Sequence, residues 1–190
     1  KMRKYRSYCT CFGVKEGEVL IEKCYNLLKK QINKKELMAH RENAQFALLL
    51  TYDSREALVD RIEKIEKVLN SVLPNIKLYF GVGVYLVEVG DKDIEQLYNN
   101  ALLACDMLGE EAENKMAFFD VEMNNQRIWE RKVEDDMNRA LANKEFQVYL
   151  QPKISTTEEV LAGAEALVRW IHPQEGFIPP NKFIPIFEKN

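Results

Sequence analysis

The sequence has no apolar run near the roughly 18 residues that a membrane-spanning helix needs. Its first residues are basic and aromatic, without the hydrophobic core of a signal peptide. It has four cysteines but no CxxC pair of the kind found in zinc sites. We therefore expect a cytoplasmic segment with reduced thiols and no membrane contact, and a Cys9/Cys11 metal pair is the less favoured interpretation. Whether the full-length protein carries sensory or membrane segments upstream of this sequence is left open.

The sequence also lacks a large excess of either charge sign. It has 27 Lys and Arg residues and 30 Asp and Glu residues, which gives a net charge of -3. The charges are mixed along the chain, and the basic cluster at residues 1–6 is too short to form an electropositive face. No nucleic acid polymer is expected as a partner. With 46% hydrophobic residues among 190, the composition predicts one globular domain or a little more, with a real core.

The first 120 residues alternate between helical and extended patterns. Apolar residues at helical spacing predict helices at 16–32, 58–72 and 93–108. Short apolar or β-branched runs predict strands at 37–40, 46–50, 76–87 and 115–119. We expect the strands at 37–40 and 46–50 to form a hairpin with Asn43 in its turn. In the strand at 76–87, Gly81 and Gly83 indicate that another element approaches closely.

This order, together with Gly13-x-x-x-Gly17-Glu18-x-Leu20, the FGVGVY strand and residues 100–109, resembles the GGDEF domain of diguanylate cyclases over residues 1–120. The resemblance implies an α/β (α+β) fold, a ferredoxin-like palm of the nucleotide cyclase type without its opening strand. An active cyclase of this family condenses two GTP molecules with the help of bound metal ions.

The residues at the family's catalytic positions do not suit that chemistry. The GGDEF letters fall at five consecutive residues: Glu42, Asn43, Ala44, Gln45 and Phe46. The metal-binding aspartate of the first strand falls at Lys1, whose charge repels a divalent cation. The resemblance therefore implies a catalytically inactive domain that holds no catalytic metal.

Nucleotide-binding positions differ as well. The family's two guanine-binding residues fall at Cys9 and Glu18, and its phosphate-binding lysine falls at Asp106, which would repel a triphosphate. The inhibitory RxxD motif falls at residues 33–36, Asn-Lys-Lys-Glu, where no arginine offers a bidentate clamp. We expect neither GTP binding nor product feedback at these positions.

A highly charged segment at 121–143 carries apolar residues at roughly heptad intervals and predicts a stiff connecting helix. Beyond it, residues 146–151 alternate apolar and polar side chains, which predicts a half-buried strand that ends at Pro152. In the next extended run, Glu165 and Arg169 share one face. A carboxylate and a guanidinium suit a metal ion and a phosphate, and a surface ion pair is the plainer alternative.

The spaced motifs EF-x-VYLQP, G-x-EALVRW-x-HP and G-x-I-x-P-x-x-FIP-x-x-E are similar to the opening of the EAL domain of cyclic-di-GMP phosphodiesterases. The resemblance implies that Glu165 is a metal ligand, that Arg169 holds a substrate phosphate and that Gln151 lies near the nucleotide. It also implies a (β/α)8-type barrel of about 250 residues, of which this chain holds the first strand-helix portion. The domains predicted are thus 1–120, 121–143 (linker helix) and 144–190.

These resemblances predict a bacterial cyclic-di-GMP signalling protein in which an inactive GGDEF domain regulates or dimerises an EAL domain. The complete EAL domain is expected to hydrolyse cyclic-di-GMP to pGpG with Mg²⁺ or Mn²⁺, whereas this segment alone needs no cofactor and is no enzyme. The alternatives are a non-enzymatic receptor or scaffold and a GTP-sensing pseudo-cyclase, and a homodimer stays open. The apolar residues of 183–187 are expected to be exposed, unless they pack on the first domain or on another copy.

Overall fold

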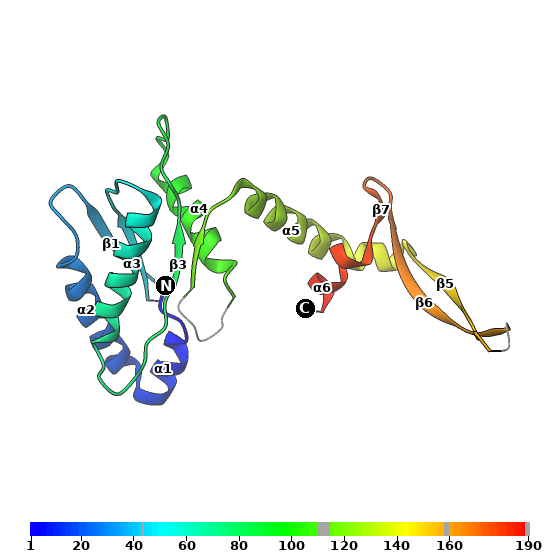
Figure 1. Cartoon of the computed structure of the whole chain (residues 1–190), viewed down its shortest axis with the longest axis horizontal. Helices are drawn as coiled ribbons and strands as arrows, with labels where there is room; N and C mark the ends of the chain where they lie inside the picture. The colour runs from blue at the N-terminus through cyan, green and yellow to red at the C-terminus, as the bar shows by residue number, and fades with distance from the viewer. Residues whose placement is uncertain (43, 110–114, 158–159, 189–190) are drawn as a thin grey trace. The chain divides into compact units, whose positions relative to one another are not determined.

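The chain forms two compact units, Lys1–Met123 and Asn124–Asn190, each described here by itself (Figure 1). The structure is a computed structural model, and it describes residues 1–42, 44–109, 115–157 and 160–188. None of the helices in these ranges has the length and apolarity needed to cross a bilayer.

The first unit is a mixed α/β arrangement. Its elements are α1 (Tyr5–Phe12), α2 (Val14–Lys29), β1 (Leu37–Arg41), β2 (Gln45–Leu49), α3 (Arg55–Asn70), β3 (Gly81–Val84), α4 (Ile94–Asp106) and β4 (Lys115–Phe118). The helices form where apolar residues recur every three to four positions, and α3 and α4 begin at side-chain caps. The Ser54 hydroxyl accepts from the Ala57 N–H, and the Asp93 carboxylate accepts from the N–H groups of Glu95 and Gln96.

The core of this unit lies between α2, α3 and the strands. It is built from buried apolar side chains, among them Leu20, Cys24 and Leu28 of α2, Ile65 and Leu69 of α3, and Leu78 and Phe80. Burial raises the pKa of the Cys24 thiol to about 11, so this cysteine stays a neutral apolar side chain at physiological pH. The helical stripes predicted from the sequence are thus the faces that pack.

The predicted hairpin is confirmed. β1 and β2 pair antiparallel with Leu37 opposite Leu49 and Arg41 opposite Gln45. The turn residue predicted to adopt a left-handed conformation, Asn43, lies outside the described residues. Its neighbour Ala44 does adopt one, with φ of 58°.

β3 is shorter than the predicted strand at 76–87 and pairs in parallel with β4. The close approach predicted at its glycines is confirmed: a Cβ on Gly83 would overlap the carbonyl oxygen of Ala101 in α4, and one on Gly81 would overlap the guanidinium of Arg3. Within the described ranges, β1-β2 and β3-β4 are two separate two-stranded sheets. The single sheet of a ferredoxin-like palm therefore stays a prediction.

The second unit contains most of α5 (Val121–Ala142), followed by β5 (Phe146–Ile154), β6 (Leu161–His172), β7 (Gly176–Ile178), the 3-10 turn η1 (Pro180–Lys182) and α6 (Ile184–Phe187). The strands pair antiparallel in the order β5-β6-β7, which differs from the parallel strands of a (β/α)8 barrel.

Two predictions for this unit were wrong. β5 does not end at Pro152 but continues to Ile154, since proline is tolerated where its missing N–H costs no ladder bond. Nor is the strand half-buried, because its apolar face is open: Val148 is 69% exposed and Leu150 68%.

The prediction that residues 183–187 are exposed was also wrong. Phe183 is 2% exposed and Ile186 7%. Both join Trp170 of β6 and Val133 of α5 in one buried cluster. The linker helix predicted at 121–143 forms, and it supplies the apolar surface that covers this tail.

Candidate functional site

The register of the β5–β6 hairpin decides which polar side chains share a face. Gln151 stands directly opposite Glu165, and Gln147 stands directly opposite Arg169. Because directly opposed residues share a face and alternate residues along a strand do too, these side chains lie on one side of the hairpin. We call this side the polar face; it comprises Gln147, Tyr149, Gln151, Lys153, Glu165, Leu167 and Arg169.

The carboxylate of Glu165 has a cation beside it. Lys153 Nζ lies 3.1 Å from Glu165 Oε2, and the two side chains are 63% and 53% exposed. Lys153 stands opposite Gly163, where an added Cβ would meet open space, so its side chain is free to lean along the strand. An ion pair this exposed contributes little to stability, which leaves the Glu165 carboxylate available for another cation.

Arg169 lies at the other end of the polar face and is half-buried. One of its nitrogens, Nη1, donates to the Val168 carbonyl at 2.9 Å. Its guanidinium carbon lies 6.0 Å from the centroid of the Tyr149 ring, a cation–π contact. These contacts leave most of the five guanidinium N–H donors for a planar oxyanion such as a phosphate.

The polar face fits part of a divalent metal site. Mg²⁺ and Mn²⁺ prefer oxygen ligands, and the face offers the Glu165 carboxylate with the amide oxygen of Gln151 opposite it. No group of three or more His, Cys, Asp or Glu side chains able to hold a metal lies among the residues that the structure describes.

In the first unit, two residues at the end of the hairpin turn, Ala44 and Gln45, are engaged in packing and hydrogen bonding. Ala44 is 2% exposed, and its carbonyl accepts from the Met2 N–H at 3.0 Å. The amide oxygen of Gln45 accepts from the Tyr98 hydroxyl at 3.0 Å. Neither alanine nor an engaged neutral amide makes a good ligand for a divalent cation.

Lys1 and Asp106 form an ion pair. Lys1 Nζ lies 2.9 Å from Asp106 Oδ1, with side chains 30% and 45% exposed. The GGDEF resemblance led us to expect these residues at the positions of a metal-binding aspartate and a phosphate-binding lysine. In the structure the two charges pair with each other.

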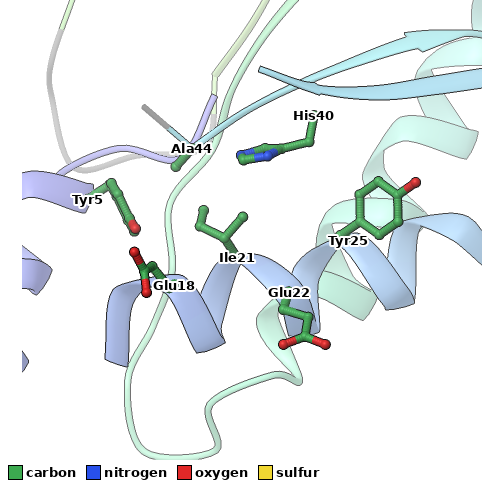
Figure 2. Close-up of a pocket in the computed structure, with 7 residues that line it drawn as sticks. All are labelled: Tyr5, Glu18, Ile21, Glu22, Tyr25, His40 and Ala44. Atoms are coloured by element: carbon green, nitrogen blue, oxygen red, sulfur yellow. The ribbon is translucent and has the colours of Figure 1, made fainter. Parts of the chain in front are cut away.

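A cavity of about 420 Å³ lies between α1, α2 and β1 (Figure 2). Its lining comprises Tyr5, Glu18, Ile21, Glu22, Tyr25, His40 and Ala44. Burial and a hydrogen bond with Cys9 raise the pKa of Tyr5 to about 12. Among the described residues, two carboxylates and neither a lysine nor an arginine line this cavity, so its charge disfavours a nucleoside triphosphate.

Glu36, the last residue of the motif aligned with RxxD, is bound to the protein itself. Arg61 Nη1 and Nη2 lie 2.6 and 2.7 Å from its two carboxylate oxygens. The N–H groups of Asn33 and Thr51 donate to the same carboxylate at 2.8 and 2.9 Å. This bidentate clasp joins the loop before β1 to α3 and occupies the carboxylate that an external ligand would need.

The model of the EAL domain family covers residues 134–190. This stretch matches the EAL domain. It contains β5, β6 and the polar face, together with the last turns of α5.

Two curated relatives extend the comparison. Over 189 residues, 97% of this chain and 28% of the relative, the chain is 23% identical to the bifunctional diguanylate cyclase/cyclic di-GMP phosphodiesterase MucR of Pseudomonas aeruginosa. Over 51 residues, 27% of this chain and 14% of the relative, it is 51% identical to the cyclic di-GMP phosphodiesterase PdeL of Escherichia coli. The chain therefore spans less than a third of either relative.

One solved structure resembles almost the whole chain in fold. It is the S helix-GGDEF-EAL part of Vibrio cholerae LapD bound to c-di-GMP, with a TM-score of 0.53 and 17% sequence identity. The match covers 99% of this chain and 45% of that chain. It supports the order of a GGDEF-like part followed by an EAL part as a matter of fold alone.

The structure brings the three residues singled out from the EAL-like motifs, Gln151, Glu165 and Arg169, onto one face. Two members of that face, Lys153 and Tyr149, were not predicted. The period-two alternation of β5 could have found them, because each lies two residues from Gln151.

Proposed function

We propose that this chain is part of a cyclic-di-GMP signalling protein of the GGDEF/EAL type. In this proposal the first unit is a GGDEF-like domain without cyclase activity, and the second unit is part of an EAL domain. The observation that carries the proposal is the register that sets Gln151 opposite Glu165 with Arg169 on the same face. The match of residues 134–190 to the EAL domain supports it.

The reaction proposed is hydrolysis of one phosphodiester bond of cyclic-di-GMP to give linear pGpG. Water adds its oxygen to phosphorus, the P–O bond to the ribose 3′-oxygen breaks, and that oxygen takes up a proton. A divalent cation held in part by Glu165 would lower the pKa of the attacking water and would neutralise charge on the phosphate. The chain's own contribution is Glu165 as a metal ligand, Arg169 as a donor to the phosphate oxygens and Gln151 as an amide beside them.

The first unit is proposed to have a non-catalytic role. The engaged turn at Ala44 and Gln45, the paired charges of Lys1 and Asp106, and the acidic lining of the cavity all disfavour GTP and its metal ions. The role proposed for the first unit is therefore regulation or dimerisation of the EAL part.

A second candidate function is a receptor or scaffold that binds cyclic-di-GMP without cleaving it. Its support is the position of Lys153 beside Glu165, since this ammonium competes, although weakly, with a metal ion for the carboxylate. A GTP-sensing role has the weaker support, the Glu18 carboxylate in the cavity of Figure 2.

Hydrolysis of cyclic-di-GMP by the full-length protein with Mg²⁺ or Mn²⁺ tests the proposal. We expect pGpG to form with the wild-type protein and not with Glu165→Ala. Binding without turnover would favour the receptor. The absence of both binding and turnover would contradict both candidates.

A further inference from the structure

The end of α5 is tied to β6 through side chains that the proposed reaction does not use. Three members of this group are buried: Glu145 is 9% exposed, Trp170 1% and His172 2%. A buried polar group destabilises the fold unless it is hydrogen-bonded. The partners of these residues therefore show what the group fastens together.

Glu145 joins the last turn of α5 to β6. Its Oε2 accepts from Trp170 Nε1 at 3.0 Å, and its carbonyl accepts from the Ile171 N–H at 2.9 Å. Its own N–H donates to the Ala140 carbonyl in α5 at 2.9 Å. One residue thus fixes both the backbone and a side chain of β6 directly after Arg169.

His172 makes the second connection. Its Nε2 lies 3.0 Å from Asp136 Oδ2 in α5, while its Nδ1 accepts from the N–H groups of Gln174 and Glu175 at 3.1 and 3.0 Å. Since Nδ1 accepts, the proton lies on Nε2, which donates to Asp136. Arg139 Nη2 lies 3.0 Å from the same Nε2 and, as a donor, makes a close contact with it rather than a hydrogen bond. Arg139 Nη1 holds the other oxygen of Asp136 at 2.9 Å.

We propose that Asp136 and Glu145 are positioning residues for Arg169. This inference rests on the proposed function, in which Arg169 binds a phosphate of cyclic-di-GMP. The backbone that follows Arg169 is held by Glu145 at Trp170 and Ile171, and by Asp136 of α5 at His172. Because Glu145 is itself bonded to Ala140 of α5, the place of the guanidinium on the polar face depends on where α5 lies. Displacement of a binding group by about 1 Å costs up to about 100-fold in kcat/KM.

The inference also gives α5 a role in regulation. α5 begins at Val121, soon after β4 ends at Phe118, so α5 is the direct chain connection from the first unit. A change in the first unit that shifts α5 would alter the affinity for the dinucleotide through these two residues. The connecting helix is then part of the substrate site's support.

The chain offers a matched control in the neighbouring residue. Asp135 Oδ2 pairs with Arg131 Nε at 3.1 Å, and these side chains are 60% and 74% exposed. The Asp136 side chain is 16% exposed. Asp135→Asn and Asp136→Asn are therefore the same substitution on the same helix, and only the second one touches β6.

The test is steady-state hydrolysis of cyclic-di-GMP by the full-length protein and its Asp136→Asn, Glu145→Gln, Asp135→Asn and Arg169→Ala variants. We expect KM to rise about tenfold in Asp136→Asn and Glu145→Gln with kcat within about twofold of wild type, the pattern of lost binding. Asp135→Asn should match the wild type. If the protein binds without turnover, the Kd for cyclic-di-GMP takes the place of KM.

The outcomes separate this inference from the proposed function. If Arg169→Ala weakens binding but Asp136→Asn and Glu145→Gln do not, the positioning role is overturned and the function stands. A lower melting temperature with unchanged KM marks a merely structural role and also overturns it. If Asp136→Asn does not fold, the KM of Glu145→Gln decides whether the positioning role stands. An Arg169→Ala variant with wild-type KM would instead contradict the proposed function.

Discussion

Lys153 and Glu165 face each other diagonally across the β5–β6 ladder, with Nζ 3.1 Å from Oε2. A divalent cation bound at Glu165 has to displace this ammonium. Because both side chains are more than half exposed, the pair is worth at most about 1 kcal/mol. The lysine is thus a weak competitor for the carboxylate.

We predict that Lys153→Met tightens metal binding. Removing the competing charge should lower the Kd of the full-length protein for Mn²⁺ by about two- to fivefold, the size expected for an exposed ion pair. Isothermal titration measures this without turnover. Lys132→Met is the control, because Lys132 pairs with Glu175 away from the polar face. An unchanged or higher Kd would show that Lys153 does not compete.

Glu36→Gln should destabilise the first unit. The Glu36 side chain is fully buried and Arg61 is 27% exposed, so the substitution leaves a largely buried guanidinium without its counter-charge. We expect a loss of about 3 kcal/mol in the free energy of unfolding at pH 7, measured by urea denaturation. A loss below about 0.5 kcal/mol would mean that the clasp contributes nothing.

The same pair predicts a pH dependence. The Arg61 guanidinium and the N–H groups of Asn33 and Thr51 hold the pKa of Glu36 well below its usual range. A lowered folded-state pKa gives stability that is complete above the unfolded glutamate value, about 4.3, and is lost as the pH falls toward the folded value. The difference in stability between wild type and Glu36→Gln should therefore be constant from pH 7 to about 5 and shrink below that. A difference that grows on acidification would contradict the assignment.

Gly83→Ala should prevent α4 from packing on β3. The added methyl would overlap the Ala101 carbonyl and Cys105, and backbone cannot yield as a flexible side chain does. We expect a cost of about 3 kcal/mol or loss of folding, seen as a lower melting temperature. Gly163→Ala is the matched control, since nothing lies within 4 Å of its new methyl. Equal melting temperatures for the two variants would be the contrary result.

GTP should be neither bound nor converted by this chain. With a carboxylate at Asp106 and Glu18 and Glu22 in the cavity, the first unit repels a triphosphate. The measurements are titration with GTP and Mg²⁺ and an assay for cyclic-di-GMP formation. Micromolar binding would favour the GTP-sensing alternative.

The sequence predicted the helices, the hairpin and the close approach at Gly83, because these depend on local periodicity and on the size of one residue. It also predicted that Glu165 and Arg169 share a face. That Gln151 stands opposite Glu165 depends on the pairing register of two strands, which alternation within each strand does not specify.

Long-range contacts account for what the sequence did not predict. The partner of Glu36 lies 25 residues away in α3, and no spacing pattern links the two. The burial of Phe183 depends on Val133, which comes from a helix interpreted as a separate linker. The hydrogen bond between Glu145 and Trp170 likewise arises only when β6 folds back along the end of α5.

The most direct test of the central claim is cyclic-di-GMP hydrolysis by the full-length protein across a titration of Mg²⁺, beside Glu165→Gln and the surface control Asp135→Asn. The account predicts metal-dependent formation of pGpG by the wild type and by Asp135→Asn, and a loss of at least about 100-fold in Glu165→Gln. Equal turnover by wild type and Glu165→Gln would contradict the claim that the polar face of β5 and β6 is the reaction site.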